Sequence, residues 1–330
     1  MTQHTPPHPV PRSQPQAGGP QYPASRSPET GAPREPQQTR PRLPGWARAL
    51  LALVAFEATS FLILALMYVS GLYEAISNSS EPLRTEAITL LHSFWLPSYL
   101  LFTFLLTRYV DRRPMRVTGL TLNRRALLGL LAGTGISVAA VGGLTAVFFF
   151  LGSGIRVPEE TWSESAVLPV WLVVVNTIVF CYVFQGIGEE AVMRGYLLQS
   201  LSNHPKRAVW ISVIVFTIPH LLSSGGQENA LDRVLYLADP FGFALAAAYL
   251  ALMMRSTWAA IGIHGGLHLG SKLMPIVTGV SLPSGRLTWI ATGLVFCAIA
   301  ALLASRISKQ RWTEIAARGP YALPASHKKH

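Results

Sequence analysis

Cysteine and charge are both scarce in this chain of 330 residues, which has two cysteines and only 13% charged residues. Soluble domains average about 25% charged residues, so the composition argues against a purely soluble enzyme. Cys181 and Cys297 both lie within apolar runs. That placement supports neither a disulfide framework nor a cysteine-based zinc site.

Acidic residues are also few, at 16 against 27 Lys and Arg, which gives a formal net charge of +11. Such an excess could suggest nucleic acid as a partner. The basic residues, however, lie at the edges of apolar runs, where the positive-inside rule places them. The charge therefore indicates membrane topology, and we expect no nucleic-acid partner.

Hydrophobic residues make up 50% of the chain, and its mean hydropathy is +0.35. They gather in runs of about 17 to 25 residues, the length of a helix that spans a bilayer. We therefore predict an all-α polytopic membrane protein of about eight transmembrane helices, with its active site inside the bundle. The expected helices cover residues 46–72, 86–109, 125–152, 167–193, 207–222, 234–254, 257–276 and 288–306.

The ends of the chain differ from its middle. Residues 1–43 hold roughly half of the 24 prolines and much Gln, Ser and Gly, a composition typical of disorder. We expect a disordered cytoplasmic tail over 1–43, without a cleavable secretory signal. A membrane domain over 44–308, with a core at about 167–275, and a short basic cytoplasmic tail over 309–330 are expected to follow.

The loops alternate in charge. The loop at 153–166 is acidic, whereas the loops at 108–125 and 195–206 and both ends of the chain are basic. The positive-inside rule then places 153–166 outside and 195–206 inside. We predict a multi-pass protein of the plasma membrane with both termini in the cytoplasm.

Three polar clusters interrupt the expected spans. A charged residue within a span costs about 2.5–3.5 kcal/mol on insertion scales, so such residues are candidates for function. The clusters are Gly188 to Arg194, Phe216 to His220, and His264 to Lys272. These clusters carry the candidate chemistry.

The first two clusters suggest a division of roles. Glu190 and Arg194 are four residues apart on one helix face and can form an ion pair. The alternative to a functional role for this pair is a structural charge cluster at the helix end. Glu189 is rotated away from that pair and is left without a partner. Glu189 and His220 are nearly equidistant from the turn at Asn203 to Pro205. In an antiparallel helical pair they lie at the same height and can face each other.

The third cluster has a spacing used by metal sites. His264 and His268 are four residues apart on one helix face, as in helices where two imidazoles bind one zinc ion. The alternative is a pair of histidines hydrogen-bonded across a polar seam. Glycines around them allow a neighbouring helix or a substrate to approach closely.

The three clusters together resemble the CAAX prenyl protease and bacteriocin-processing family of intramembrane metalloproteases, also called CPBP or Abi. The matching patterns are Glu-Glu-x-x-x-Arg, Phe-x-x-x-His, and a helix with His-x-x-x-polar, over about residues 167–275. The resemblance implies a peptidase that acts on a membrane-associated peptide or protein. It further implies Glu189 as the base, His220 as its partner, His264 as an oxyanion or metal group, and Phe216 as a residue behind them.

One position departs from the family pattern. His268 stands where the family usually has Asn. A ring N–H could imitate the amide donor, but an imidazole can also bind a metal. Two versions therefore stay open: hydrolysis with Glu189-activated water alone, or with a divalent metal such as zinc held by His220, His264, His268 and Glu189.

Two other function classes fit the sequence. A proton-coupled transporter could relay protons through Glu, His and Asp239 inside a bundle. A non-catalytic membrane scaffold or immunity protein could use the same residues only to hold the helices together. The substrate itself, prenylated or not, cannot be inferred from the spans.

Overall fold

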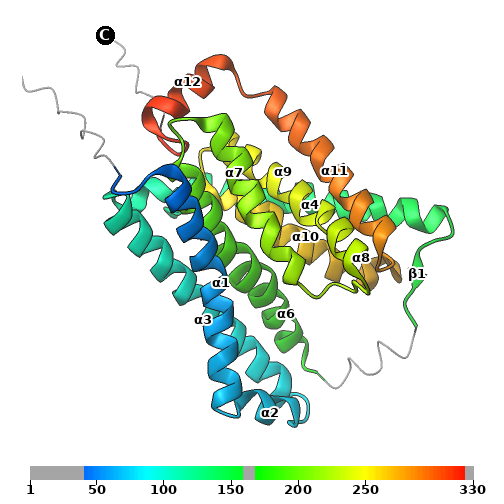
Figure 1. Cartoon of the computed structure of the whole chain (residues 1–330). Helices are drawn as coiled ribbons and strands as arrows, with labels where there is room; N and C mark the ends of the chain where they lie inside the picture. Colours follow the sequence, from blue (N-terminus) through cyan, green and yellow to red (C-terminus); the bar gives the residue numbers. More distant parts are fainter. Residues whose placement is uncertain (1–40, 159–167, 324–330) are drawn as a thin grey trace, which may run out of the picture. The chain divides into compact units, whose positions relative to one another are not determined.

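The computed structural model describes residues 41–158 and 168–323, most of which are helical (Figure 1). The expected Pro-rich tail up to residue 40, the acidic stretch 159–167 and the last seven residues lie outside the described residues. The main α-helices are α1 (Gly45–Val69), α2 (Leu72–Ser77), α3 (Leu83–Leu105), α4 (Arg124–Phe150), α6 (Val170–Ile178), α7 (Pro205–Thr217), α8 (Ala230–Tyr236), α9 (Ala238–Met254), α10 (Thr257–Thr278), α11 (Arg286–Ser305) and α12 (Lys309–Arg318).

The expected all-α polytopic membrane fold is confirmed. Six helical segments of the described chain are long and apolar enough to cross a membrane. The other two expected spans fall short for local reasons: α7 has only 13 residues, and α10 carries two histidines and Lys272 among its glycines. The number of eight spans therefore stays a prediction.

Two helix pairs pack backbone to backbone through glycine. A Cβ on Gly262 of α10 would lie 2.3 Å from a carbonyl oxygen of α4, and one on Gly133 of α4 would lie 2.4 Å from a carbonyl oxygen of α10. Gly242 of α9 and Gly293 of α11 make the second such contact, at 2.4 Å. In a bilayer the hydrophobic effect does not drive helices together, and small residues at helix crossings instead allow the close backbone packing that joins them. These contacts fix α10, which carries two of the candidate histidines.

The helix that carries the Glu pair is not a regular α-helix. After α6 it continues as two π-helical stretches, η3 (Val179–Gly188) and η4 (Ala191–Leu198). The sequence-based prediction ended this helix at residue 193, which is too early. Tyr196, Leu197 and Leu198 are buried, so this apolar packing continues the helix through the basic end of the bundle.

Short elements complete the connections. A 3₁₀ turn, η2 (Met115–Thr118), precedes α4, and another, η5 (Ile218–Leu222), follows α7. A π turn, η1 (Leu106–Val110), ends α3. Strands β1 (Ile155–Arg156) and β2 (Val280–Ser281) pair antiparallel, and this ladder ties the end of α4 to the end of α10.

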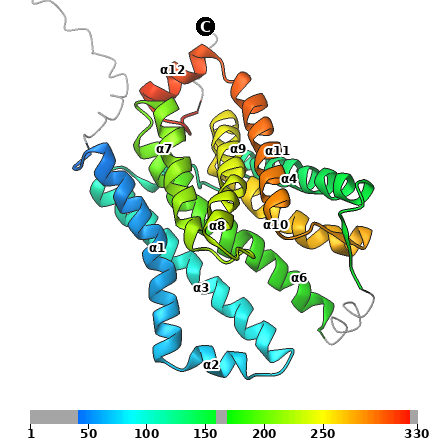
Figure 2. The same cartoon turned by 45° about the vertical axis from the view of Figure 1, so that its right-hand side comes forward.

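Helix α12 lies at the end of the helical bundle opposite α2 (Figure 2). We call the α12 end the basic end, because five basic residues lie at or near helix termini there, against Arg84 and Arg286 at helix starts of the other end: Arg48, Arg124, Lys206, Arg255 and Arg311. The end with α2 and the β1–β2 ladder is called the opposite end. The charge asymmetry predicts that the basic end faces the cytoplasm.

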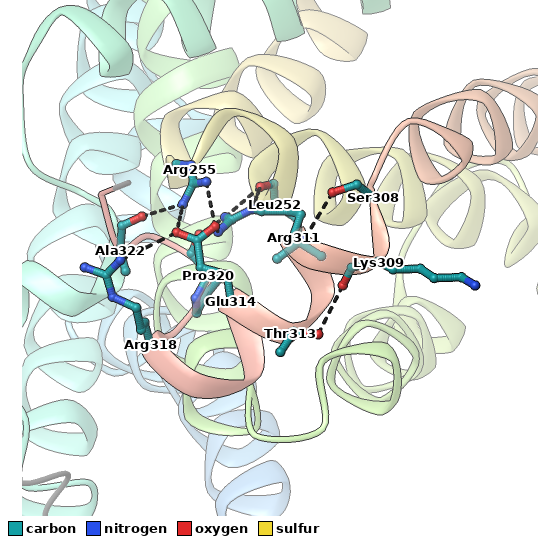
Figure 3. A network of polar contacts seen from close by, with 10 residues as sticks. All are labelled: Leu252, Arg255, Ser308, Lys309, Arg311, Thr313, Glu314, Arg318, Pro320 and Ala322. Atoms are coloured by element: carbon teal, nitrogen blue, oxygen red, sulfur yellow. Dashed lines mark hydrogen bonds and ion pairs between the residues drawn. The ribbon is translucent and has the colours of Figure 1, made fainter. Parts of the chain in front are cut away.

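The expected basic tail is in part a docked helix. Within it, α12 binds the end of α9 through a polar network (Figure 3). Arg255 donates two hydrogen bonds of 2.7 Å to the Glu314 carboxylate and a third to the carbonyl of Ala322. Arg311 donates to the carbonyl of Leu252 and also contacts Glu314. The hydrogen bonds from Arg255 and Arg311 hold the pKa of Glu314 down at about 2.

The residues after α12 reach back towards the Glu pair. The hydroxyl of Tyr321 donates to the backbone carbonyl of Arg194 at 2.7 Å, and its ring lies against Gly119, where a Cβ would be 2.6 Å away. Burial raises the pKa of Tyr321, so the hydroxyl stays a proton donor. The C-terminal segment thereby contacts the backbone of η4 directly.

Candidate active site

The Glu pair stands at the junction of the two π-helical stretches. Glu189 and Glu190 are α-helical between η3 and η4, and both are buried. π-helical segments are rare and are found frequently at functional sites. The i→i+5 hydrogen bonding in η3 and η4 changes which side chains share a face there, although Glu190 and Arg194 still pair at the i,i+4 spacing of a regular helix.

Glu190 is held through one of its oxygens, Oε1, while its Oε2 is buried without a hydrogen-bond partner among the described residues. Arg194 Nη1 donates to Glu190 Oε1 at 3.0 Å, and His264 Nδ1 lies 3.2 Å from the same oxygen. Arg194 also donates to the carbonyl of Ala244 in α9 at 2.8 Å. The side chains of Glu190 and Arg194 are 0% exposed and that of His264 is 1% exposed. This cluster joins η4, α9 and α10 inside the bundle.

Glu189 has no such partner. Its Oε2 is buried without a hydrogen-bond partner, and the Tyr99 ring covers the preceding residue, Gly188, so closely that a Cβ there would lie 2.5 Å away. The charge of Glu57 in α1 also acts on Glu189. The structure thus separates the two carboxylates: one is held by Arg194 and His264, and the other faces α1 and α3.

Phe216 lies at the centre of the candidate residues. Its ring is 4.7 Å from the ring of His220 and 5.7 Å from that of His264, between ring centroids. The guanidinium carbon of Arg194 is 4.8 Å from the Phe216 ring centroid, within the range of a cation–π contact. The completely buried Phe216 therefore touches a member of each of the three polar clusters.

His220 follows α7 in the turn η5 and is half-buried. Its Nδ1 lies 2.9 Å from the carbonyl oxygen of Phe216. A carbonyl only accepts, so Nδ1 carries the hydrogen and Nε2 keeps its lone pair. Within the described residues, no hydrogen bond or ion pair joins His220 to Glu189. The ring centroid of Phe56 lies 6.5 Å from that of His220 and 6.0 Å from that of Tyr99.

His268 lies one helical turn beyond His264. The two rings are 5.3 Å apart, and the His268 ring also meets Phe180 edge-on at 5.6 Å. His268 is half-buried, whereas His264 is completely enclosed. His268 therefore lies at the edge of the enclosed cluster, with part of its side chain outside it.

The suggested metal ligands are not gathered into one group. Among residues 41–158 and 168–323, no three His, Cys, Asp or Glu side chains are placed to hold a metal ion together. Two rings nevertheless have the bonding typical of metal ligands: His220 Nδ1 is directed at a carbonyl and His264 Nδ1 at a carboxylate, which leaves Nε2 for a metal. The donor chemistry fits a metal, but the assembled geometry does not.

The sequence analysis missed three residues near the site. Glu57 is the one acidic residue within α1 and could have been found by the rule for charges in spans. Tyr99 carries no such signal, because a tyrosine in an apolar helix is usual. Tyr321 lies more than 100 residues from Arg194 in the sequence, and only the tertiary fold brings it to η4.

The comparisons with known proteins agree with this geometry. Residues 166–270 match the family model of type II CAAX prenyl endopeptidases, Rce1-like. This part of the chain is Rce1-like. Neither a curated protein nor a solved structure gives a match.

The Rce1-like segment runs from the start of α6 into α10 and contains every residue of the three polar clusters up to Gly270. It confirms the family resemblance that the motifs indicated. Tyr99, Glu57 and Tyr321 lie outside the matched segment.

Proposed function

We propose that the chain is an intramembrane endopeptidase that hydrolyses a peptide bond of a membrane-associated peptide or protein, with Glu189 as the general base. One observation carries the assignment of the base. Of two adjacent buried carboxylates, Glu190 is held through Oε1 by Arg194 and His264, whereas no hydrogen bond or ion pair of the described residues includes the carboxylate of Glu189. A general base must have an unpaired lone pair, and both oxygens of Glu189 keep theirs.

The reaction follows from the lone pairs of the site. Glu189 takes a proton from water as the water oxygen attacks the carbonyl carbon of the substrate, and a tetrahedral oxyanion forms. Glu189 gives up that proton, which passes to His220 Nε2, left free by the contact of Nδ1 with Phe216, and His220 delivers it to the leaving amine. The C–N bond then breaks, and the acid and amine products separate.

His264 is placed to stabilise the oxyanion. With Nδ1–H directed at Glu190, protonation of Nε2 gives an imidazolium that the neighbouring carboxylate stabilises. Such a ring offers Nε2–H to a developing negative charge, and a donor of this kind contributes about 10²–10³ in kcat. His268 is the second donor, at the position where the family usually has Asn.

The scheme does not require a metal, whose suggested ligands are not gathered into one group among the described residues. The Nε2 atoms of His220 and His264, with His268 and Glu189, would be its ligands. A bound divalent ion would polarise the carbonyl and lower the pKa of water.

The test compares cleavage products. Purified wild-type protein and the Glu189→Gln variant are incubated with membrane proteomes, and new N-termini are sequenced. We expect new termini with wild type and none with Glu189→Gln, because the amide cannot accept the proton. Glu86→Gln is the matched control, since Glu86 is exposed at the start of α3. The same termini from Glu189→Gln would contradict the assignment of the base.

The alternatives give different results in the same preparation. A transporter would move protons or solute across vesicles without producing new termini. A scaffold would retain its cellular phenotype in the Glu189→Gln variant.

A further inference from the structure

A cavity of about 270 Å³ lies between the candidate site and the opposite end of the bundle. His268 lines its inner part, and the loop that ends at Ser284, before α11, lines its outer part. Helices α4, α9, α10 and α11 contribute the walls. At about 30 Å³ for each water molecule, the space corresponds to roughly nine waters, enough for one extended side chain.

The lining is polar in one particular way. Its only charged side chain is Asp239 in the first turn of α9. Seven hydroxyl-bearing residues also line it, from α4, α8, α10, α11 and the segment between α10 and α11: Thr145, Tyr236, Ser271, Ser281, Ser284, Thr288 and Thr292. The lining therefore holds one carboxyl group, no Lys or Arg, and hydroxyls that can donate or accept hydrogen bonds.

Asp239 has no partner to neutralise it. Its Oδ1 is buried without a hydrogen-bond partner, and no ion pair of the described residues includes it. The nearest acid along the chain, Asp232, is by contrast paired with Arg286 at 2.5 Å. An ionised carboxylate only accepts hydrogen bonds, so its complement is a donor, best a cation.

We propose that this cavity is a specificity pocket that takes a basic side chain, Lys or Arg, from the substrate residue next to the cleaved bond, with Asp239 as its anionic partner. The inference rests on the proposed peptidase function. His268 belongs to both the cavity and the His264 pair, so a chain that crosses the site places the neighbouring side chain in the cavity. Hydroxyls along the walls contact the aliphatic part of this Lys or Arg side chain and accept hydrogen bonds from the N–H groups that Asp239 does not bind.

The first test measures the charge preference of the cavity without any cleavage. Ser271, which lines the cavity and is exposed, is replaced by Cys in a background in which Cys181 and Cys297 are changed to Ser. Modification rates are compared for a trimethylammonium and a sulfonate methanethiosulfonate in detergent. We expect the ratio of the cation's rate to the anion's rate to be at least about tenfold higher at Ser271→Cys than at a control cysteine. The control is Ser80→Cys, in the exposed turn before α3.

The Asp239 variants identify the source of that preference. Asp239→Asn should bring the ratio at Ser271→Cys down to that at Ser80→Cys, and Asp239→Glu, which keeps the charge, should retain it. Equal ratios at the two cysteines with Asp239 present would overturn the proposal, as would a ratio unaffected by Asp239→Asn. If Asp239→Asn does not fold, the Asp239→Glu protein is titrated to acid pH instead. Loss of the preference for the cation at acid pH supports the proposal, and a preference that persists at acid pH contradicts it.

The second test uses the sequenced termini. Lys or Arg should be enriched at one position beside the cut in wild-type products and not in those of Asp239→Asn. Cuts without such enrichment would refute the pocket while leaving the peptidase in place. No cuts from wild type would refute the peptidase, and the thiol test would then still decide whether the cavity selects cations.

Discussion

The fully buried cluster of Glu190, Arg194 and His264 makes Glu190→Gln a stability variant. Removing the carboxylate leaves the Arg194 guanidinium without its ion-pair partner at 0% exposure, with only the Ala244 carbonyl and the Phe216 ring beside it. Breaking a buried pair from one side costs about 3–5 kcal/mol. At roughly 2 °C per kcal/mol for a domain of this size, the melting temperature should fall by about 6–10 °C.

The assay is thermal unfolding in detergent, followed by intrinsic tryptophan fluorescence. Glu189→Gln is the matched control, because it is the same substitution one residue away at a carboxylate without a cation, and it should unfold close to wild type. A compensating change supplies the second check. In the double variant Glu190→Gln with Arg194→Met, the unpaired charge is gone, and stability should recover relative to Glu190→Gln alone.

Two results would refute this reasoning. Equal melting temperatures for Glu189→Gln and Glu190→Gln would mean that the two carboxylates do not differ in role. A double variant that loses the sum of the two single losses would mean that Glu190 and Arg194 are not coupled.

Three further predictions concern metal, acid and topology. If hydrolysis is metal-free, elemental analysis should find no metal in the wild type, and His268→Asn should keep or raise activity. If zinc takes part, His268→Asn should lose bound zinc and activity together. Because the folded pKa of Glu314 is about 2, below about 4.3 in the unfolded chain, its stabilising effect is complete above pH 4.3 and disappears towards pH 2. The difference in melting temperature between wild type and Glu314→Gln should therefore close over that interval, and a constant difference would contradict the ion pair. Cysteines at Asn203 and Ser80, both exposed, should label from opposite sides of the membrane, the first from the cytoplasm; labelling from one side would contradict the predicted topology.

The amino-acid sequence by itself determined the class of the protein and the residues with chemistry. Apolar runs of bilayer length have one stable backbone solution in lipid, the helix, so the expected spans coincide with α1, α3, α4 and α9 to within a few residues. Charges within those runs are costly, and this cost singled out the three clusters before any contact was known. The match of residues 166–270 to the Rce1-like family covers the same clusters.

Tertiary structure alone decided which of these residues meet. Nearly equal distances from the turn at Asn203 to Pro205 placed Glu189 opposite His220, but the histidine that contacts the Glu pair is His264, through Glu190. The π-helical stretches on both sides of the pair shift the faces that a regular helix would present, and the sequence carries no local signal for them. Glycine contacts between α4 and α10 and the return of Tyr321 to Arg194 join residues far apart in the chain. Such contacts depend on how whole helices pack, which local patterns do not determine.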